Sequence, residues 1–336
     1  DAFRSSVARD GGFRLAKRLG LSFGLLPFSN IGYSYSNTKA LNSTDGSTSV
    51  VKATNTYSGT GGLHQVYLGL GWSPFKGFAI GVNAAYLWGD YSRSVINSYT
   101  DAYANTLSKY YTAEVHNYKL DFGMQYTQKI TKNDAITLGV TYGLGHKLSS
   151  DPKCQIISTN AQTAVADTAT YSIGNGLELP HSYGVGLMWN HANRWRVGAD
   201  YTLQKWSSVA YPKFDTSTNS YELVSGQFAD RHKMTVGGEF CPDERSRNFF
   251  KRVHYRMGAS YATDYLKIKG QNGPKEYSVS AGFGIPIVNG YNNRSLLNIS
   301  AQWVRQDSKT FVTENSFRIN IGLTFNERWF AKWKME

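Results

Sequence analysis

The 336-residue sequence contains no apolar run as long as the roughly 20 residues that a membrane-spanning helix needs. Together with a mean hydropathy of −0.41, this excludes a helical membrane protein. Only two cysteines are present, Cys154 and Cys241, so there is neither a disulfide framework nor a cysteine metal site. The net charge is +12, but Lys and Arg never occur in runs longer than two. Nucleic-acid binding is therefore not expected, and the charge fits either outer-leaflet phosphates or a diffusely solvated surface.

What the sequence does contain is alternation of apolar and polar residues, the pattern of β-strands with two different faces. In residues 195–203, Trp195 and Val197 share one face, and Arg196 and Asp200 share the other. The pattern recurs at residues 78–88, 118–126, 183–189, 234–240, 255–261, 277–285 and 317–325. These segments exceed the about 5–6 residues typical of soluble strands, and many apolar faces end in an aromatic residue. Both features are typical of a transmembrane β-barrel, in which every second side chain of a strand faces the lipid.

Connections of two kinds interleave along the chain. The short class comprises residues 28–30, 74–77, 131–134, 191–194, 242–251 and 288–293, and the long class comprises residues 42–62, 91–111, 150–177, 207–227, 269–274 and 308–314. Short periplasmic turns and long outer loops alternate in this way in up-and-down barrels. The strand count is 13, from near Phe13 to near Phe325. Because bacterial barrels have even strand numbers, the sequence predicts an all-β, transmembrane, up-and-down antiparallel barrel of about 14 strands.

A single domain, residues 1–336, is predicted. The chain begins at Asp1 without Met, as expected of a processed protein. Residues 1–12 are a lead-in that forms either the end of the first strand or a hatch remnant, residues 13–327 are the barrel, and residues 328–336 are a periplasmic tail. The fourteenth strand lies in residues 1–7 or upstream. Cys154 and Cys241 then fall at opposite ends of the barrel and cannot be bridged.

The polar faces of the predicted strands should line an enclosed lumen. This assigns to the lumen Lys119, Asp121, Gln125, Arg196, Asp200, Lys233, Glu239, Arg256 and Arg318. Charges of opposite sign on neighbouring strands indicate either ion pairs that stiffen the barrel or a polar selectivity lining.

Aromatic residues fall into two predicted groups. The anchors at the membrane interfaces are Trp72, Trp88, Trp189, Trp195, Trp206, Trp329 and Trp333. The outer-loop aromatics that could bind a ligand or a partner are Tyr91, Tyr103, Tyr110, Tyr111 and Tyr211.

Several strand-like stretches resemble a known family. They are LSFGLLPFSNIGYSY at residues 21–35, YSGTGGLHQVYLGLG at 57–71, AIGVNAAYLWG at 79–89, YRMGASYATDYLKIKG and VSAGFGIPI within 255–287, and ENSFRINIGLTFNERWF at 314–330. Together they resemble OmpP1/FadL/TodX-like outer-membrane transport proteins of the Bacteroidota type. The resemblance implies a 14-stranded barrel that takes up hydrophobic small molecules through its lumen, with release past an N-terminal hatch or through a lateral opening. The family's Asn-Pro-Ala hatch motif is absent, and the predicted lumen is strongly polar.

Catalytic and metal-binding motifs are weak. Gly20-Leu-Ser22-Phe-Gly24 matches a nucleophile elbow, but Ser22 lies in the middle of a predicted strand. The seven histidines show no ligand spacing on one face. The chain is therefore expected not to be an enzyme and to need no cofactor or metal.

Two functions remain open, both in the bacterial outer membrane with the C-terminus in the periplasm. The leading hypothesis is a channel for small hydrophobic molecules. The alternative is a non-transporting barrel subunit of a larger assembly, such as a β-barrel insertion or secretion machine. The expected partners are outer-membrane lipid and lipopolysaccharide, with a hydrophobic substrate in the first case and other outer-membrane proteins or lipoproteins in the second. The sequence identifies neither a substrate nor a partner nor an oligomeric state.

Overall fold

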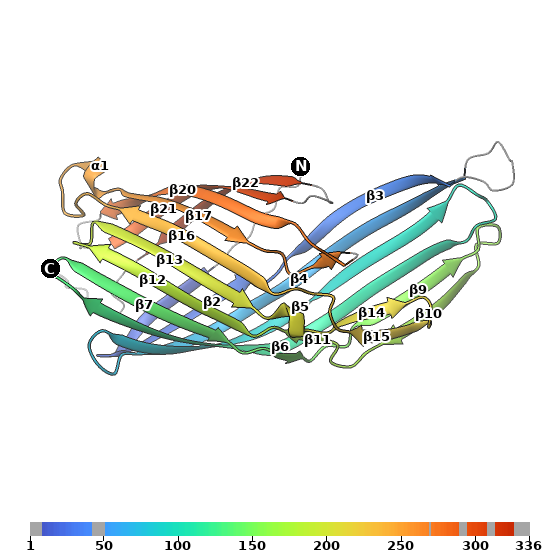
Figure 1. The fold of residues 1–336 in the computed structure, drawn as a ribbon, viewed down its shortest axis with the longest axis horizontal. Helices are drawn as coiled ribbons and strands as arrows, with labels where there is room; N and C mark the ends of the chain where they lie inside the picture. The colour runs from blue at the N-terminus through green and yellow to red at the C-terminus, as the bar shows by residue number, and fades with distance from the viewer. Residues whose placement is uncertain (1–8, 42–50, 269, 289–293, 308–312, 326–336) are drawn as a thin grey trace, which may run out of the picture.

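An antiparallel path of thirteen strands dominates the computed structural model, which describes residues 9–41, 51–268, 270–288, 294–307 and 313–325. The strands of the path are β1 (Arg9–Ala16), β2 (Leu19–Pro27), β4 (Val51–Trp72), β5 (Phe78–Tyr99), β6 (Thr106–Lys129), β7 (Asp134–Gly143), β12 (Ser182–His191), β13 (Trp195–Gln204), β16 (Arg231–Phe240), β17 (His254–Ala262), β20 (Lys275–Val288), β21 (Arg294–Asp307) and β22 (Glu314–Thr324). They curve round into a barrel (Figure 1). The predicted up-and-down barrel of about 14 strands is confirmed. Residues 1–7, one place predicted for a further strand, lie outside the described residues.

The remaining elements belong to one end of the barrel or to its connections. They are β3 (Ile31–Leu41), β8 (His146–Leu148), β9 (Lys153–Thr159), β10 (Ala166–Ser172), β11 (Leu177–Leu179), η1 (Trp206–Ser208), β14 (Tyr211–Asp215), β15 (Ser220–Val224), α1 (Phe249–Arg252), β18 (Lys267–Ile268) and β19 (Gln271–Asn272). Within the described part of the chain, neither short helix could cross a bilayer, because neither is long and apolar enough.

The strand register confirms the two faces that alternation predicts. Trp195 pairs with Phe240, and its neighbour Arg196 pairs with Glu239, so like faces meet across the strands. The apolar face is the exposed one: Leu68 is 52% exposed, Val236 is 55% exposed and Ile321 is 73% exposed. A soluble protein would bury such a continuous surface. Its position on the outside of the barrel is that of a surface in contact with lipid.

An aromatic residue bounds the outer apolar face of β5 at each end. Phe78 stacks on Phe75 with 5.0 Å between ring centroids, and Trp88 stacks on His64 with 5.9 Å between centroids. The strand between them covers about 33 Å at roughly 3.3 Å per residue. With the usual tilt, this length gives an apolar band about 25 Å tall, as transmembrane barrels have.

Three strands continue beyond this band and form what we call the extension. It consists of β3, β9 and β10 together with residues 51–61 of β4, 90–99 of β5 and 106–115 of β6, and it projects from one end of the barrel (Figure 1). Glycines stand where the strands leave the barrel. Gly61 has a φ of +107°, and Gly89 has a φ of +143°. A Cβ at Gly61 would lie 2.4 Å from the carbonyl oxygen of Asp90, so the strands can approach here only without a side chain.

The extension corrects three predicted loops and one predicted turn. Residues 150–177 were expected to be a loop but contain β9 and β10. Most of residues 42–62 and 91–111 were expected to be loops but are strand, because the alternation of these segments is polar on one face and so lacks the apolar stripe of the barrel. Residues 28–30 do not reverse the chain: β2 and β3 both pair with β4, one after the other. The reversal occurs instead between β1 and β2.

Candidate functional site: the extension and the polar lumen

The inner face of the extension carries an aromatic cluster. The register places Tyr33, Arg93, Tyr111, Cys154 and Tyr171 in one row across neighbouring strands of this face. Gly59 lies in the same row, between Tyr33 and Arg93, and leaves room there for the Tyr33 ring, which a Cβ at Gly59 would approach to 2.4 Å. Since β5 keeps its register through Gly89, this face is continuous with the lumen side of the barrel. The extension therefore has its own packed core on that side.

The hairpin β14–β15 closes this core. Tyr221 of the hairpin lies 6.4 Å from Tyr111, and Phe214 lies 5.2 Å from Tyr171, measured between ring centroids. Lys109 adds a cation–π contact, with its Nζ 5.2 Å from the centre of the Phe214 ring. The hairpin is part of the connection between β13 and β16, so these contacts join distant parts of the sequence at one end of the barrel.

Arg93 is the polar centre of the cluster. Its guanidinium carbon lies 4.6 Å from the centre of the Tyr111 ring, and its buried Nε has no hydrogen-bond partner among the described residues. Burial raises the pKa of Tyr111 to about 12 and also raises the pKa of Tyr91 and of Tyr221. The phenols therefore stay neutral, and the cation lies over the ring face of Tyr111. Within the described residues it forms no ion pair with a carboxylate.

The outer face of the extension has the opposite chemistry. It is dominated by hydroxyl side chains from every strand, namely Ser34, Ser36, Thr38, Thr54, Thr56, Ser58, Thr60, Ser92, Ser94, Ser98, Thr106, Ser108, Thr112, Thr159, Thr168, Thr170 and Ser172. Ser58 and Ser94 share a hydrogen bond of 2.6 Å, and Thr38 and Thr54 share one of 3.0 Å. On the same side of the strands, the surface thus changes from apolar to hydroxyl as it leaves the membrane band.

An apolar cluster lies where the extension meets the barrel. Leu87 and Val115 are fully buried on the inner faces of β5 and β6 and pack with Leu148 and Leu179 of the paired strands β8 and β11. Leu63 and Leu177 border the cluster. This part of the inner surface is therefore apolar, although the sequence predicted a polar lumen.

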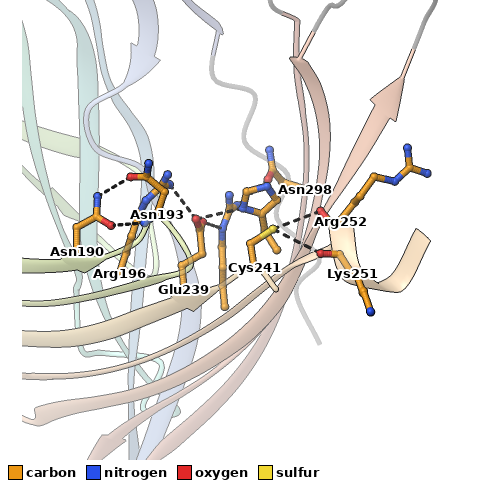
Figure 2. Close-up of polar contacts among 10 residues, drawn as sticks. Asn190, Asn193, Arg196, Glu239, Cys241, Lys251, Arg252 and Asn298 are labelled. Carbon is orange, nitrogen blue, oxygen red and sulfur yellow. Dashed lines mark hydrogen bonds and ion pairs between the residues drawn. The ribbon is translucent and has the colours of Figure 1, made fainter. Parts of the chain in front are cut away.

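A carboxylate with two arginine neighbours and one histidine neighbour lies on the lumen face near the short-turn end of the barrel (Figure 2). Arg196 donates from Nη1 to Glu239 Oε1 at 2.9 Å, and Arg256 donates from Nε to Glu239 Oε2 at 2.6 Å. His254 Nδ1 lies 3.1 Å from Oε1. Arg256 also donates from Nη1 to Asn298 at 2.6 Å. The Glu239 side chain is only 17% exposed, so this charge depends on its partners for stability.

The other predicted lumen residues divide into paired and unpaired groups. Lys119 and Asp121 form an ion pair. Gln125, Asp200 and Arg196 line one cavity of about 420 Å³ together with Glu239. Lys233 pairs across the sheet with Thr202, and Arg318 with Gln302, on the same polar face. Asp200, Lys233 and Arg318 form no ion pair within the ranges that the structure describes. The stiffening ladder is thus present only in part.

Three of the predicted tryptophan anchors project outward near the short turns: Trp72 is 50% exposed, Trp189 is 42% exposed and Trp195 is 47% exposed. Trp88 lies at the opposite border of the band, beside His64 and Tyr86. Trp206 lies at neither border of the apolar band. It stacks on Tyr265 at 4.5 Å and contacts Phe228 within the loops, because the connection after β13 folds over itself there. Trp329 and Trp333 lie outside the described residues.

The five predicted loop aromatics do not form one surface. Tyr91 and Tyr211 lie close to each other and to Tyr111 within the inner cluster. Tyr110 lies on the hydroxyl face, and Tyr103 lies in the turn between β5 and β6, where it is 80% exposed. Only Tyr103 is in a loop, because the other four lie in strands.

The two cysteines lie as predicted. Cys154 is buried in β9 of the extension, and Cys241 is buried at the short-turn end, where its sulfur lies 3.7 Å from the Arg252 carbonyl oxygen (Figure 2). Both are free thiols.

No group of three or more His, Cys, Asp or Glu within the described residues could hold a metal ion.

Comparison with known proteins supplies the family. The BamG family model matches residues 12–336. The chain belongs to the BamG family. No curated protein matches it.

Solved structures show the fold of this BamG-family chain. The CymD monoaromatic hydrocarbon channel superimposes with a TM-score of 0.64 at 12% identity, over 97% of this chain and 83% of that one. The toluene transporter TbuX of Ralstonia pickettii gives a TM-score of 0.60 at 13% identity, over 95% and 79% of the two chains. The toluene transporter TodX of P. putida gives 0.56 at 13% identity, over 95% and 81%. The predicted FadL/TodX likeness is thus confirmed for the fold, and fold and family point to the bacterial outer membrane.

Sequence reasoning missed the extension and its inner core. One indication was available: Leu87 is a large apolar residue on a face of residues 78–88 that otherwise carries small residues and Asn83, directly beside Trp88. Tyr91, Arg93 and Val95 then continue that face, which marks a change from lumen to packed interior.

Proposed function

We propose that this chain is a barrel subunit of a larger outer-membrane protein assembly, a β-barrel insertion or secretion machine, in which the extension contacts other subunits. The barrel spans the outer membrane with the extension and the long connections outside the cell and the C-terminus in the periplasm. Membership of the BamG family is the observation that carries the proposal, because it supports a role beside other outer-membrane proteins.

Two features of the chain support this function over transport. A passage for hydrophobic molecules should be apolar, whereas the cavity inside the barrel is lined by Arg196, Asp200 and Glu239. The extension is a sheet that stands clear of the barrel and has its own aromatic core, which a simple pore does not require. An exposed sheet of this kind is suited to binding other proteins.

Transport of small hydrophobic molecules is the second candidate. It is favoured by the likeness to the hydrocarbon-channel fold and by an apolar groove of about 530 Å³ that includes Leu70, Trp72 and Phe122 on the outer wall. Such a groove could serve as a lateral exit.

Purification from native outer membranes in mild detergent separates the two functions. We expect a stoichiometric complex in which mass spectrometry identifies further outer-membrane proteins, and a slower insertion of other barrels when the chain is depleted. Toluene uptake by intact cells should be unchanged on depletion. A chain that purifies alone, together with a loss of toluene uptake, would reverse the order of the two candidates.

A further inference from the structure

The strand β3 forms one edge of the extension. It pairs with β4 without interruption, from Ile31 opposite Gly61 to Leu41 opposite Val51. Along its other edge, no strand of the described chain lies beside Tyr33 to Leu41. This stretch is therefore an open edge of regular β-structure beyond the membrane band.

Two backbone hydrogen bonds of β4 show which backbone groups face the open edge. On the β5 side of β4, Thr100 N–H donates to the Lys52 carbonyl at 3.0 Å. On the other side, Leu63 N–H donates to the Ser29 carbonyl at 3.1 Å. Consecutive residues of an antiparallel strand point their N–H and C=O groups to opposite sides. Odd-numbered residues of β4 therefore point toward β3.

The register then assigns the edge of β3. Ala53 points toward β3 and lies opposite Lys39, so Lys39 is bonded to β4. Residues bonded to β4 alternate along β3, so the even-numbered residues of β3 point their N–H and C=O groups away from β4. The N–H and C=O groups of Ser34, Ser36, Thr38 and Ala40 thus form a row of donors and acceptors at the open edge.

Open edges usually carry features that prevent further pairing, such as proline, bulges, inward charges or a very short strand. Residues 33–41 contain no proline and one charge, Lys39, and the register with β4 shows no bulge. The edge is therefore a regular template for another strand.

We propose that the β3 edge from Ser34 to Ala40 binds an extended segment of another protein of the assembly by strand addition. The inference rests on the proposed function and names the element that docks. Tyr35 stacks on Tyr57 with ring centroids 5.0 Å apart and remains 58% exposed on the inner face. An incoming strand places an apolar or aromatic side chain beside Tyr35 and small polar side chains beside Ser34 and Ser36.

A second copy of this chain does not fit the same edge in antiparallel order. Two copies in one membrane are related by an axis along the bilayer normal. Such an axis leaves both copies of β3 running away from the membrane in the same sense. An antiparallel partner is therefore not the β3 strand of a second copy of this chain.

Proline substitution tests the edge without cutting the β3–β4 ladder. Ser36→Pro together with Thr38→Pro removes two N–H groups that face outward and none that bond to β4. The matched control is Thr168→Pro together with Thr170→Pro on β10, the opposite edge of the extension. There Ile173 N–H donates to the Pro152 carbonyl at 3.1 Å, so even-numbered residues of β10 face outward.

The measurement is performed on the complex purified from native outer membranes. We expect the double β3 variant to weaken retention of a stoichiometric partner by about tenfold or more, since two interchain hydrogen bonds are lost, and the β10 control to remain within about twofold. In the wild-type complex, hydrogen exchange at Ser34, Ser36, Thr38 and Ala40 should be slower than in the isolated chain. Unchanged exchange at Asn37 and Lys39 in the variant shows that β3 still pairs with β4.

Each contrary outcome has a distinct meaning. A partner that binds without protecting these four amides, and that the β3 variant retains, overturns the inference and leaves the proposed function standing. Protection that arises from a dimer of this chain, seen by native mass, also overturns it. Absence of any partner overturns the proposed function and the inference with it.

Discussion

Each of β4, β5 and β6 is one continuous strand with a half in the membrane and a half in the extension. The two halves place their apolar and polar side chains on opposite faces. In the barrel, the outer face is apolar, as at Leu68, and the inner face carries charges such as Asp121. In the extension, the outer face carries Ser and Thr, and the inner face carries Tyr111 and Arg93. The reversal occurs within a few residues of Gly61 and Gly89.

The difference shows that the medium on each side of a sheet decides which face is apolar. In the barrel, lipid lies outside and polar groups line the interior, so apolar side chains point outward. Beyond the membrane, water contacts the outer face, and the sheet is stabilised by burying aromatic residues beneath the β14–β15 hairpin.

The largest effect should come from placing the same charge on the outer face of each half of β4. Leu68→Arg lies in the apolar band, where Arg costs about 2–4 kcal/mol, whereas Thr60→Arg lies beyond it and should cost less than about 1 kcal/mol. The free energy of unfolding in phospholipid vesicles, measured by urea titration, checks the pair. Equal costs would contradict the boundary at Trp88.

The next largest effect concerns the lumen. Glu239→Gln leaves Arg196 and Arg256 without their carboxylate and should destabilise the barrel by about 1–3 kcal/mol. Asp200→Asn is the control, because Asp200 forms no ion pair with the described residues, and it should change stability by less than about 0.5 kcal/mol. The same urea titration measures both. A cost for Asp200→Asn as large as that for Glu239→Gln would argue against the ion-pair network.

A pH titration tests whether the inner cluster of the extension is buried. The pKa of Tyr111 is raised to about 12 by burial, so folding favours its neutral form. This contribution is fully present below the ordinary pKa near 10 and is lost as pH rises toward 12. Tyrosinate absorbance near 295 nm should show a late-titrating phenol that Tyr111→Phe removes, with the barrel still folded. A normal titration would show that the inner cluster is open to water.

The smallest effect is expected in the loops at the same end. Burial opposes ionisation of Asp230, but hydrogen bonds from Lys205 and Ser207 outweigh it and lower its pKa to about 2. Its contribution is present above the ordinary pKa near 3.8 and is lost as pH falls toward 2. Asp230→Asn should cost less than about 1 kcal/mol and speed hydrogen exchange in residues 205–230 at neutral pH. Unchanged exchange would mean that the Lys205–Asp230 pair does not order this connection.

Much of the barrel could be predicted because each strand repeats one simple constraint. Alternation in residues 195–203 placed Arg196 on the lumen face beside Glu239, and the structure pairs them. Alternation assigns a face to each residue but not a partner across other strands. His254 and Asn298, which complete the network around Glu239, were therefore not predicted.

The extension was not predictable in the same way. Ser58 and Ser94 lie in segments that read as polar loops, since water on the outer face removes the apolar stripe. Tyr211 and Tyr111 are far apart in the sequence, and only the fold of the connection after β13 brings them together. Trp206 was assigned to the membrane because its residue type fits an interface. Its neighbours are instead Phe228, from the far end of the same connection, and Tyr265, from another loop.

By itself, the sequence determined that this chain is an antiparallel membrane barrel. In lipid every backbone N–H and C=O group needs a hydrogen-bond partner within the protein, and strands that alternate apolar and polar residues meet this need only when they close into a barrel. The tertiary structure decided where the barrel ends and the extension begins. That boundary depends on which side chains meet across strands and which connection covers them, and such contacts between distant residues are not contained in a local pattern of alternation.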